Sequence, residues 1–159
     1  MRLTWLGFVI FAIGCGTSTP AGTPQNGDAT LQYGSTTKDL TVGSAILDPN
    51  GGGSGVAAML VQLGTDGVTC DVNLVGPTFP PHGEYVYFDV DPTTPMDYAE
   101  ALVSVISSTN NNLSLDESNG TVSITSIDTR VMGTVTFNSS TDEAGAIVAT
   151  GTFDVEKCF

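Results

Sequence analysis

The chain has 159 residues, with 17 Asp and Glu against four Lys and Arg, a net charge of −13 and a sequence pI near 4.1. Such a negative field makes nucleic acid and anionic lipid head groups poor partners. Hydrophobic residues make up 40% of the chain, which is enough for a packed core, so the composition argues against wholesale disorder and for one domain.

The first 14 residues have the anatomy of a secretory signal peptide. Arg2 supplies a charged start, and an apolar stretch over residues 3–13 leads to the small residue Gly14. This stretch is shorter than the roughly 20 residues that a membrane-spanning helix needs. We therefore predict that the chain is exported and that residues 1–14 are removed.

The signal ends in the tetrapeptide Ala12-Ile13-Gly14-Cys15, which resembles the bacterial lipobox. The resemblance implies that the thiol of Cys15 takes up diacylglycerol, that cleavage occurs just before it, and that the new N-terminus is acylated, for example with palmitate. Two or three acyl chains give stable anchoring, because each buried methylene contributes about 0.8 kcal/mol. The alternative is a plain secretory signal with an incidental cysteine.

Residues 15–27 contain Cys15 and a polar stretch rich in Pro, Gly and Thr, which is typical of a flexible tether. The folded domain is therefore expected over residues 28–159. Gly16 after the lipidated cysteine is compatible with sorting to the outer membrane in a cell that has two membranes, again by resemblance to known lipoproteins.

Two cysteines remain once Cys15 is acylated. Cys70 and Cys158 form an even pair in a compartment that permits oxidation, which predicts a disulfide between them.

Beyond residue 28 the chain breaks into short runs rich in β-branched residues, separated by clusters of Gly, Asn, Pro and Asp. This pattern predicts an antiparallel all-β domain. The Asp-Pro-Asn-Gly-Gly-Gly run at 48–53 separates the first two strands, and the proline-rich residues 76–83 cannot continue a ladder because proline lacks the donor. The predicted strands of this half are 40–47, 56–63, 69–74 and 85–90.

Residues 96–106 carry two conflicting signals. Apolar residues from Met96 to Ile106 follow helical spacing, whereas Ala101, Val103 and Val105 alternate as they would in a strand. We assign a strand because β-branched residues dominate the second half of the segment.

The last part of the chain predicts four more strands. Ser118-Asn119-Gly120 separates the run 113–117 from the alternating run 121–127, which predicts a hairpin between them. Strands 131–138 and 147–155 follow. Eight or nine strands over about 130 residues most simply form a two-layer sandwich, with a small β-barrel as the alternative.

Four carboxylates cluster in one stretch of the sequence, namely Asp89, Asp91, Asp97 and Glu100. Alternation places Asp89 and Asp91 on one strand face. Oxygen-rich loops bind calcium through roughly six to eight ligands, so a weak calcium site is one hypothesis for this cluster. A solvated acidic face and a catalytic pair of the glycosidase type are the alternatives.

Two other features of the sequence bear on a candidate catalytic or binding site. His82 stands alone in a Pro/Gly loop with no nucleophile motif nearby, so we interpret it as an exposed turn residue and assign no catalytic residue. Tyr85 and Tyr87 share a strand face, with Phe88 opposite, which fits either a sugar-stacking surface or, more strongly, a core.

The C-terminal third carries three successive motifs, G-x-V-x-I-T at 120–125, V-x-G-x-x-x-F at 131–137 and G-x-F-D at 151–154, before Cys158. This succession resembles a loose group of exported bacterial β-sandwich lipoproteins of unknown function. The resemblance implies a β-sandwich and an exported lipoprotein, and it brings no catalytic residues.

Together these features predict a lipid-anchored protein of the bacterial envelope that is not an enzyme and acts as a binding or structural module. Its membrane contact is the N-terminal lipid, and an envelope protein or a glycan is the kind of partner expected. The alternatives are a calcium-dependent or carbohydrate-binding, adhesin-like module and an Asp/Glu-dependent hydrolase. The hydrolase requires the carboxylates at 89, 91, 97 and 100 to gather in a concave pocket.

Overall fold

The computed structural model describes residues 29–33, 35–49, 51–52, 55–70, 83–109, 112–139 and 146–159. Within these ranges the chain forms nine β-strands, and no helix there is long and apolar enough to cross a membrane. The predicted signal peptide, Cys15, the tether, His82 and the end of the predicted strand 69–74 lie outside the described residues. The strands are β1 (Ala29–Tyr33), β2 (Thr36–Leu40), β3 (Val42–Asp48), β4 (Ala58–Gly64), β5 (Tyr85–Val90), β6 (Asp97–Thr109), β7 (Asn112–Ile127), β8 (Arg130–Ser139) and β9 (Ile147–Lys157).

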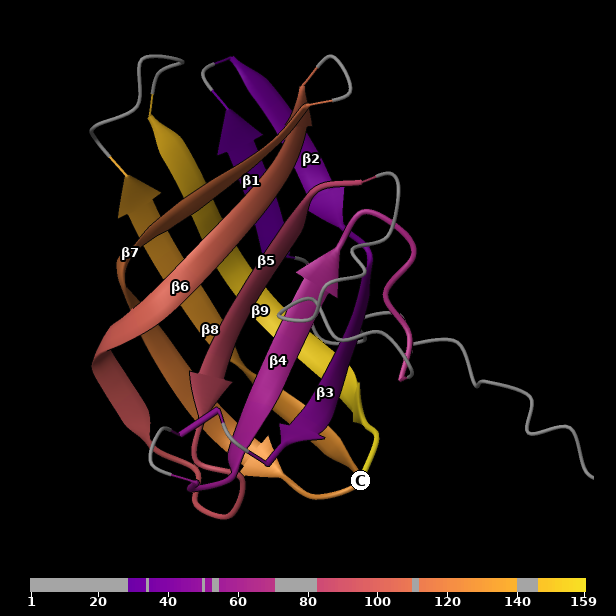
Figure 1. The fold of residues 1–159 in the computed structure, drawn as a ribbon, viewed down its shortest axis with the longest axis vertical. Coiled ribbons are helices and arrows are strands. Elements are labelled where there is room, and N and C mark those ends of the chain that lie inside the picture. Colours follow the sequence, from indigo (N-terminus) through magenta and orange to yellow (C-terminus); the bar gives the residue numbers. More distant parts are fainter. Residues whose placement is uncertain are drawn as a thin grey trace, which may run out of the picture.

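Seven of these strands close into a barrel (Figure 1). Their order is β3-β4-β5-β6-β7-β8-β9, and β9 pairs with both β8 and β3. The all-β prediction is therefore confirmed, and the small-barrel alternative, rather than the two-layer sandwich, describes the sheet. β9 is the reason for this difference. It pairs with β8 on one side and with β3 on the other, and so joins two sheet edges that would stay open in a sandwich.

Apolar side chains fill the interior of the barrel. Successive residues of a strand point to opposite sides, so every second residue contributes to this core. Phe88 of β5 and Phe153 of β9 meet there with ring centroids 5.7 Å apart. Fully burying a side chain of this kind contributes about 1.5–3 kcal/mol. Other large members of the core are Leu31, Leu40, Met59, Leu63, Phe137 and Ile147.

The β1–β2 hairpin is inserted beside β9 and continues directly into β3. β1 pairs with residues 147–151 of β9, β2 pairs with β1, and only Thr41 separates β2 from β3. β3 meets β9 further along, through two parallel residue pairs at Ser44 and Ala45. The hairpin therefore extends the sheet at one edge, where four of the five residues of β2 are exposed.

Gly43 permits the close approach of β3 and β9 at the point where the barrel closes. A Cβ at this position would overlap Val155 of β9 and would stand 3.0 Å from the backbone oxygen of Gln62. Any other residue here would have to push the two strands apart.

The predicted hairpin at Ser118-Asn119-Gly120 is wrong, because these residues lie inside β7. Gly120 marks a close approach instead of a turn: a Cβ there would stand 2.8 Å from Val103 and 2.9 Å from the backbone oxygen of Thr136. The hairpin partner of β7 is β6, and their pairing reaches Thr109 and Asn112.

Other strand predictions agree with the structure. The range predicted for 85–90 coincides with β5, and the ambiguous segment 96–106 is strand from Asp97 onward, as part of β6. The predicted strand 40–47 is divided at Thr41 between β2 and β3. β1 was not anticipated, because its five residues carry little hydrophobic signal before they pair with β9.

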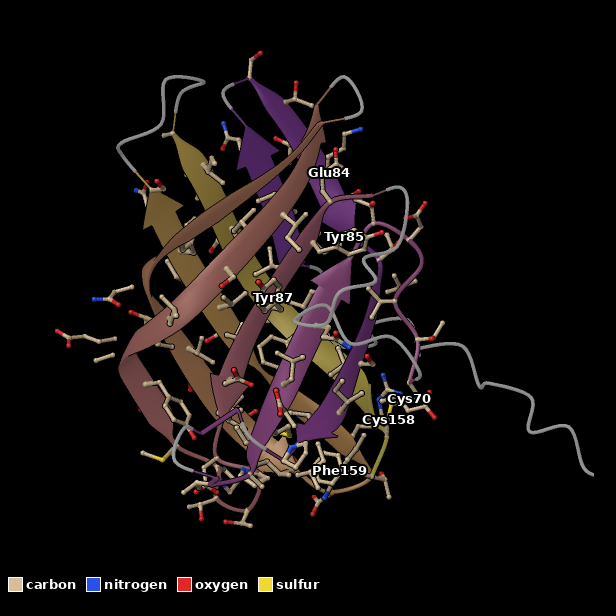
Figure 2. All side chains as sticks on the ribbon, viewed as in Figure 1. Cys70, Glu84, Tyr85, Tyr87, Cys158 and Phe159 are labelled. Atoms are coloured by element: carbon tan, nitrogen blue, oxygen red, sulfur yellow. A yellow bond between two sulfur atoms is a disulfide. The ribbon has the colours of Figure 1, made fainter. Side chains whose placement is uncertain are left out.

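A second, smaller core covers the outer face of β3, β4 and β5 (Figure 2). Strand pairing aligns Ser44, Gln62, Tyr87 and Ser104 in one row across four strands, and all four are buried. Gln62 Nε2 donates to Ser44 Oγ (3.0 Å), which in turn donates to the backbone oxygen of Thr69 (3.2 Å). The segment that follows β4 therefore lies against this face. The apolar members of the second core are Ile46, Leu60, Val68, Tyr85, Tyr87 and Ile106.

The predicted disulfide is present and fastens this segment to the C-terminus. Cys70 and Cys158 are joined with their Cα atoms 5.4 Å apart, and they lie side by side in Figure 2. The backbone N–H of Cys158 also donates to the backbone oxygen of Ala45 (2.9 Å). The end of the chain is therefore held by a covalent bond to the segment after β4 and by a hydrogen bond to β3.

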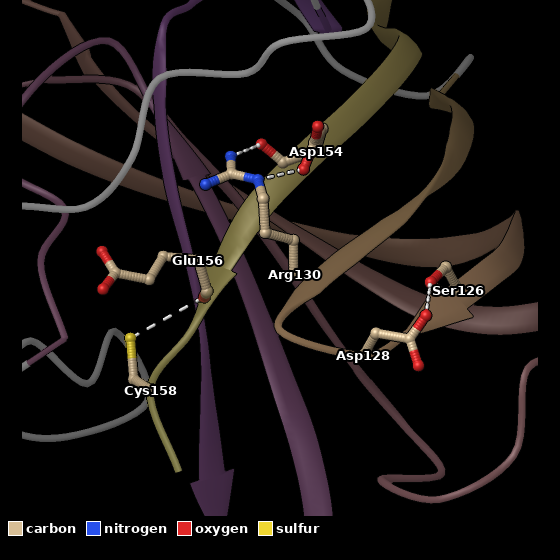
Figure 3. A network of polar contacts seen from close by, with 6 residues as sticks. All are labelled: Ser126, Asp128, Arg130, Asp154, Glu156 and Cys158. Carbon is tan, nitrogen blue, oxygen red and sulfur yellow. Dashed lines mark hydrogen bonds and ion pairs between the residues drawn. The ribbon is translucent and has the colours of Figure 1, made fainter.

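Asp154 is a buried carboxylate on β9, between the part that pairs with β1 and the part that pairs with β3. Figure 3 shows Arg130 of β8 donating to it twice: Nε to the carboxylate, and Nη2 to the backbone oxygen at 2.6 Å. The Asp154 side chain is only 3% exposed, so the guanidinium compensates for a charge that has lost most of its water.

Replacing both bridged cysteines should destabilise the fold. The bridge spans a sequence separation of 88. A loop of this size contributes on the order of 4–5 kcal/mol in a chain-entropy estimate, and native disulfides are typically worth about 2–4 kcal/mol. We expect Cys70→Ser/Cys158→Ser to lower the free energy of unfolding in urea by about 2–4 kcal/mol. Wild type in reductant is the control and should match the variant; a variant as stable as the oxidised wild type would contradict the expectation.

Removing the guanidinium from the Arg130–Asp154 pair should be costly, since Arg130→Met leaves the buried carboxylate without its cation. We expect a loss of about 3 kcal/mol in urea unfolding. The double variant Arg130→Met/Asp154→Asn is the matched control and should recover part of the loss, because it also removes the buried charge. A single variant that loses less than about 1 kcal/mol would contradict the compensating role.

Candidate functional site

A groove of about 350 Å³ opens at the end of the barrel where the β3–β4 and β5–β6 connections lie, at the bottom of Figure 1. It contains two of the carboxylates that the sequence singled out, Asp89 and Asp91. A smaller depression of about 170 Å³ over β7, β8 and β9 is lined by no ionisable side chain, so the groove is the stronger candidate. The groove is lined by Gly51, Gly52, Val56, Ala57, Ala58, Asp89, Val90, Asp91 and Tyr98.

Strand register places Asp89 at the mouth of this groove. Tyr85, Tyr87 and Asp89 alternate with the inward residues of β5 and therefore lie on its outer face. The two tyrosines are buried in the second core, whereas Asp89, paired with Leu60 of β4, is exposed. The outer face of β5 thus changes from buried to accessible within three outward positions.

Burial and, second, the negative charge of Asp48 raise the pKa of Asp89 to about 6. The side chain keeps contact with solvent, but the protein atoms around it exclude part of the water that would stabilise the charged carboxylate. Gly51 lies between the two acids: a Cβ there would stand 3.0 Å from Oδ1 of Asp89 and 3.1 Å from Cβ of Asp48. Among the residues that the structure describes, none donates a hydrogen bond to the Asp89 carboxylate.

Asp91 is engaged in a local turn. Its Oδ1 accepts hydrogen bonds from Thr93 N (2.7 Å), Thr93 Oγ1 (2.6 Å) and Thr94 N (2.9 Å), and these bonds lower the pKa of Asp91. The Asp91 N–H donates to the hydroxyl of Tyr98 (2.7 Å). Burial raises the pKa of Tyr98, which stays a neutral phenol. Asp91 and Tyr98 therefore hold the β5–β6 connection in place along one wall.

The structure does not bring all four predicted carboxylates together. Asp97 accepts a hydrogen bond from Ser123 Oγ (2.5 Å) on β7, and Glu100 lies exposed on β6; neither lines the groove. β6 is irregular between Tyr98 and Ala101, which breaks the alternation that the sequence pattern assumed. Over the described ranges, no three His, Cys, Asp or Glu side chains gather as they would around a metal ion.

Three contributors to the site were not anticipated. Gly51 belongs to a segment that the sequence marked only as a loop, Val56 was predicted to begin the strand 56–63 whereas β4 begins at Ala58, and Tyr98 stood inside the acidic stretch without an assigned role. The β3–β4 connection meets β5 through the pairing of β4 with β5, a contact between segments far apart in the chain. The sequence pattern within either segment does not predict this contact.

The sugar-stacking hypothesis for Tyr85, Tyr87 and Phe88 is wrong, because all three side chains are buried. Phe88 belongs to the barrel core, and the two tyrosines belong to the second core. The core interpretation is confirmed.

The raised pKa of Asp89 makes stability depend on pH in a defined direction. Between its ordinary pKa and about 6, the folded protein binds this proton more tightly than the unfolded chain does, so the group's contribution to stability falls as pH rises through that window. Asp89→Asn should therefore be more stable than wild type at about pH 7.5, by about 1 kcal/mol after allowance for solvent screening, and nearly equal at about pH 4. Urea unfolding at the two pH values measures the difference.

Glu100→Gln is the matched control, since it removes the same charge from an exposed position outside the groove. We expect it to change stability by less than about 0.5 kcal/mol at either pH. An equal gain in both variants at neutral pH would show general relief of negative charge and would contradict a local effect at Asp89.

Comparison of the chain with protein-family models, with curated proteins and with solved structures returned no match. The resemblance of its C-terminal third to exported lipoproteins stays a prediction.

Proposed function

We propose that this protein is a lipid-anchored component of the bacterial cell envelope, held by acyl chains on Cys15, and that it acts by binding rather than by catalysis. Support for the location comes from the sequence, in which the signal 1–14 leads into the lipobox-like residues 12–15 and the polar tether. Gly16 favours the outer membrane in a cell with two membranes. The tether gives the domain freedom to meet partners near the membrane.

The observation that supports a binding role is the groove around Asp89. Side chains occupy the barrel interior, so polar chemistry is displayed on the outside. The groove combines apolar walls with a few polar groups, which is the usual composition of a binding site. Loss of Arg2 with the signal leaves a mature net charge of −14, which argues for a cationic partner and against nucleic acid.

A hydrolase is the second candidate, because Asp89 and Asp91 share the groove and their pKa values are shifted in opposite directions. Such divergence is a feature of acid–base pairs. However, Oδ1 of Asp91 already accepts three hydrogen bonds from Thr93 and Thr94, which accounts for its shift through local structure. The binding role therefore stands first.

Lipidation is tested directly by expressing the full chain in a bacterium beside Cys15→Ser. We expect the wild type to fractionate with membranes and to carry the mass of diacylglycerol plus an acyl chain. The variant should be left unprocessed or be released, because only the thiol of residue 15 can accept the lipid.

Intact mass spectrometry and membrane fractionation of both proteins give the readout, and Cys70→Ser/Cys158→Ser is the control for a general effect of cysteine loss. That control should remain acylated. A soluble, unacylated wild type would overturn the proposed anchoring.

A further inference from the structure

The groove offers two kinds of surface side by side. On one side Asp89 presents a carboxylate that receives no hydrogen bond from any described residue and lies near the charge of Asp48. Beside it, Val56, Ala57 and the ring of Tyr98 provide an apolar wall. A ligand that satisfies both surfaces has an apolar stem and a positively charged end.

The size of the groove limits the ligand. A volume of about 350 Å³ lies at the lower end of the roughly 300–1,000 Å³ of small-molecule sites, so one long side chain is a better fit than a large ligand. Lysine and arginine bury their methylene stems along apolar surface and keep the charged head on polar groups. They match the two surfaces of the groove.

A metal ion is a weaker occupant. Calcium requires roughly six to eight oxygen ligands, and the described residues gather no three His, Cys, Asp or Glu side chains. No described Lys or Arg lines the groove: Arg130 is engaged by Asp154, Lys157 lies over the ring of Phe159, and Lys38 stands on β2, which contributes no residue to the groove. The cation must come from outside this part of the chain.

The surroundings of the groove favour a cation carried by a protein. Val56 lines the groove and is 60% exposed, and the β5–β6 connection, which supplies Asp91, also carries Met96 at 46% exposure. These apolar side chains can contact the residues on either side of an inserted lysine or arginine, which a free amine lacks.

We propose that the groove is a docking site for a cationic side chain, lysine or arginine, presented by a protein partner, with Asp89 as its ion-pair acceptor and Val56 and Tyr98 against its stem. This inference rests on the proposed binding function and names its partner class. The acidic charge of the whole chain assists the approach of such a partner, whereas the groove decides where its side chain is held.

The test is an NMR titration of the full-length, ¹⁵N-labelled protein in mild detergent with acetyl-Gly-Lys-Gly-amide, at an ionic strength of about 0.15 M to screen long-range attraction. We expect saturable shifts of the amides of Gly51, Gly52, Val56 and Tyr98, with a Kd on the order of 1 mM for so short a peptide. Acetyl-Gly-Arg-Gly-amide should shift the same amides.

Two matched variants locate the contact. Asp89→Asn should weaken binding of the lysine peptide by about tenfold, the loss expected for one charged hydrogen-bonded pair. Glu100→Gln removes the same charge outside the groove and should change the Kd less than about twofold. Equal weakening in the two variants, or shifts spread over the acidic surface, would overturn the assignment to the groove.

Two matched ligands test the chemistry and the source of the cation. The same peptide with ε-acetyl-lysine keeps the stem and loses the charge, so equal binding would overturn the ion pair. n-Butylamine carries the stem and the charge alone and should bind at least about threefold more weakly than the peptide, and equal affinity would overturn a protein source.

Failure here is distinct from failure of the anchor. An acylated, membrane-held protein whose groove amides do not respond to the peptides would overturn the docking site alone. A soluble, unacylated protein that binds the lysine peptide would overturn the anchor and support the docking site.

Discussion

The closure of the barrel at β9 is the constraint on which the rest of the structure depends. β9 pairs along its length with β8, while its other side is divided between β1 and two parallel residue pairs with β3. Two pairs are a short ladder, and three other features support it. Gly43 lets β3 approach β9, the Cys70–Cys158 bridge fastens the end of β9 to the segment after β4, and the Arg130–Asp154 contact holds β9 to β8. Together they fix the curvature of the sheet from β3 onward.

The position of the groove follows from that curvature. Once β3 is fixed against β9, the in-register pairing of β3, β4 and β5 sets which outward residues share a row. The buried row through Gln62 and Tyr87 fixes this register, because a slip by one residue would exchange the polar and apolar faces. Asp89 comes two residues beyond Tyr87 on the same face, where the second core ends. Its environment is thus a consequence of how far that core extends.

Most of the strands could be predicted from the sequence, whereas little of their tertiary arrangement could. Alternation identified β5, and β-branched residues correctly decided β6 against its helical spacing. The Ser-Asn-Gly run at 118–120 led to a wrong hairpin prediction, because glycine occurs both in turns and at close contacts between strands. Only the packing around Gly120 shows that it belongs to the second kind. For the site, Asp89 and Asp91 could be found by composition, whereas Gly51 and Val56 reach them through strand pairing between distant segments. Closure of the barrel by β9 could not be predicted either, because it also depends on pairing between segments that are far apart in the chain.

The role of β9 also determines when the fold can be completed. β1, the first described strand, pairs with the last one, and β3 pairs with the final residues of that strand, so the earliest strands wait for the end of the chain. Pairings of such high sequence separation fold slowly, because loop closure must precede any gain from contacts. The barrel therefore cannot close before residues 147–157 have been synthesised, and until then the edges of β3 and β8 stay open to pairing with other strands.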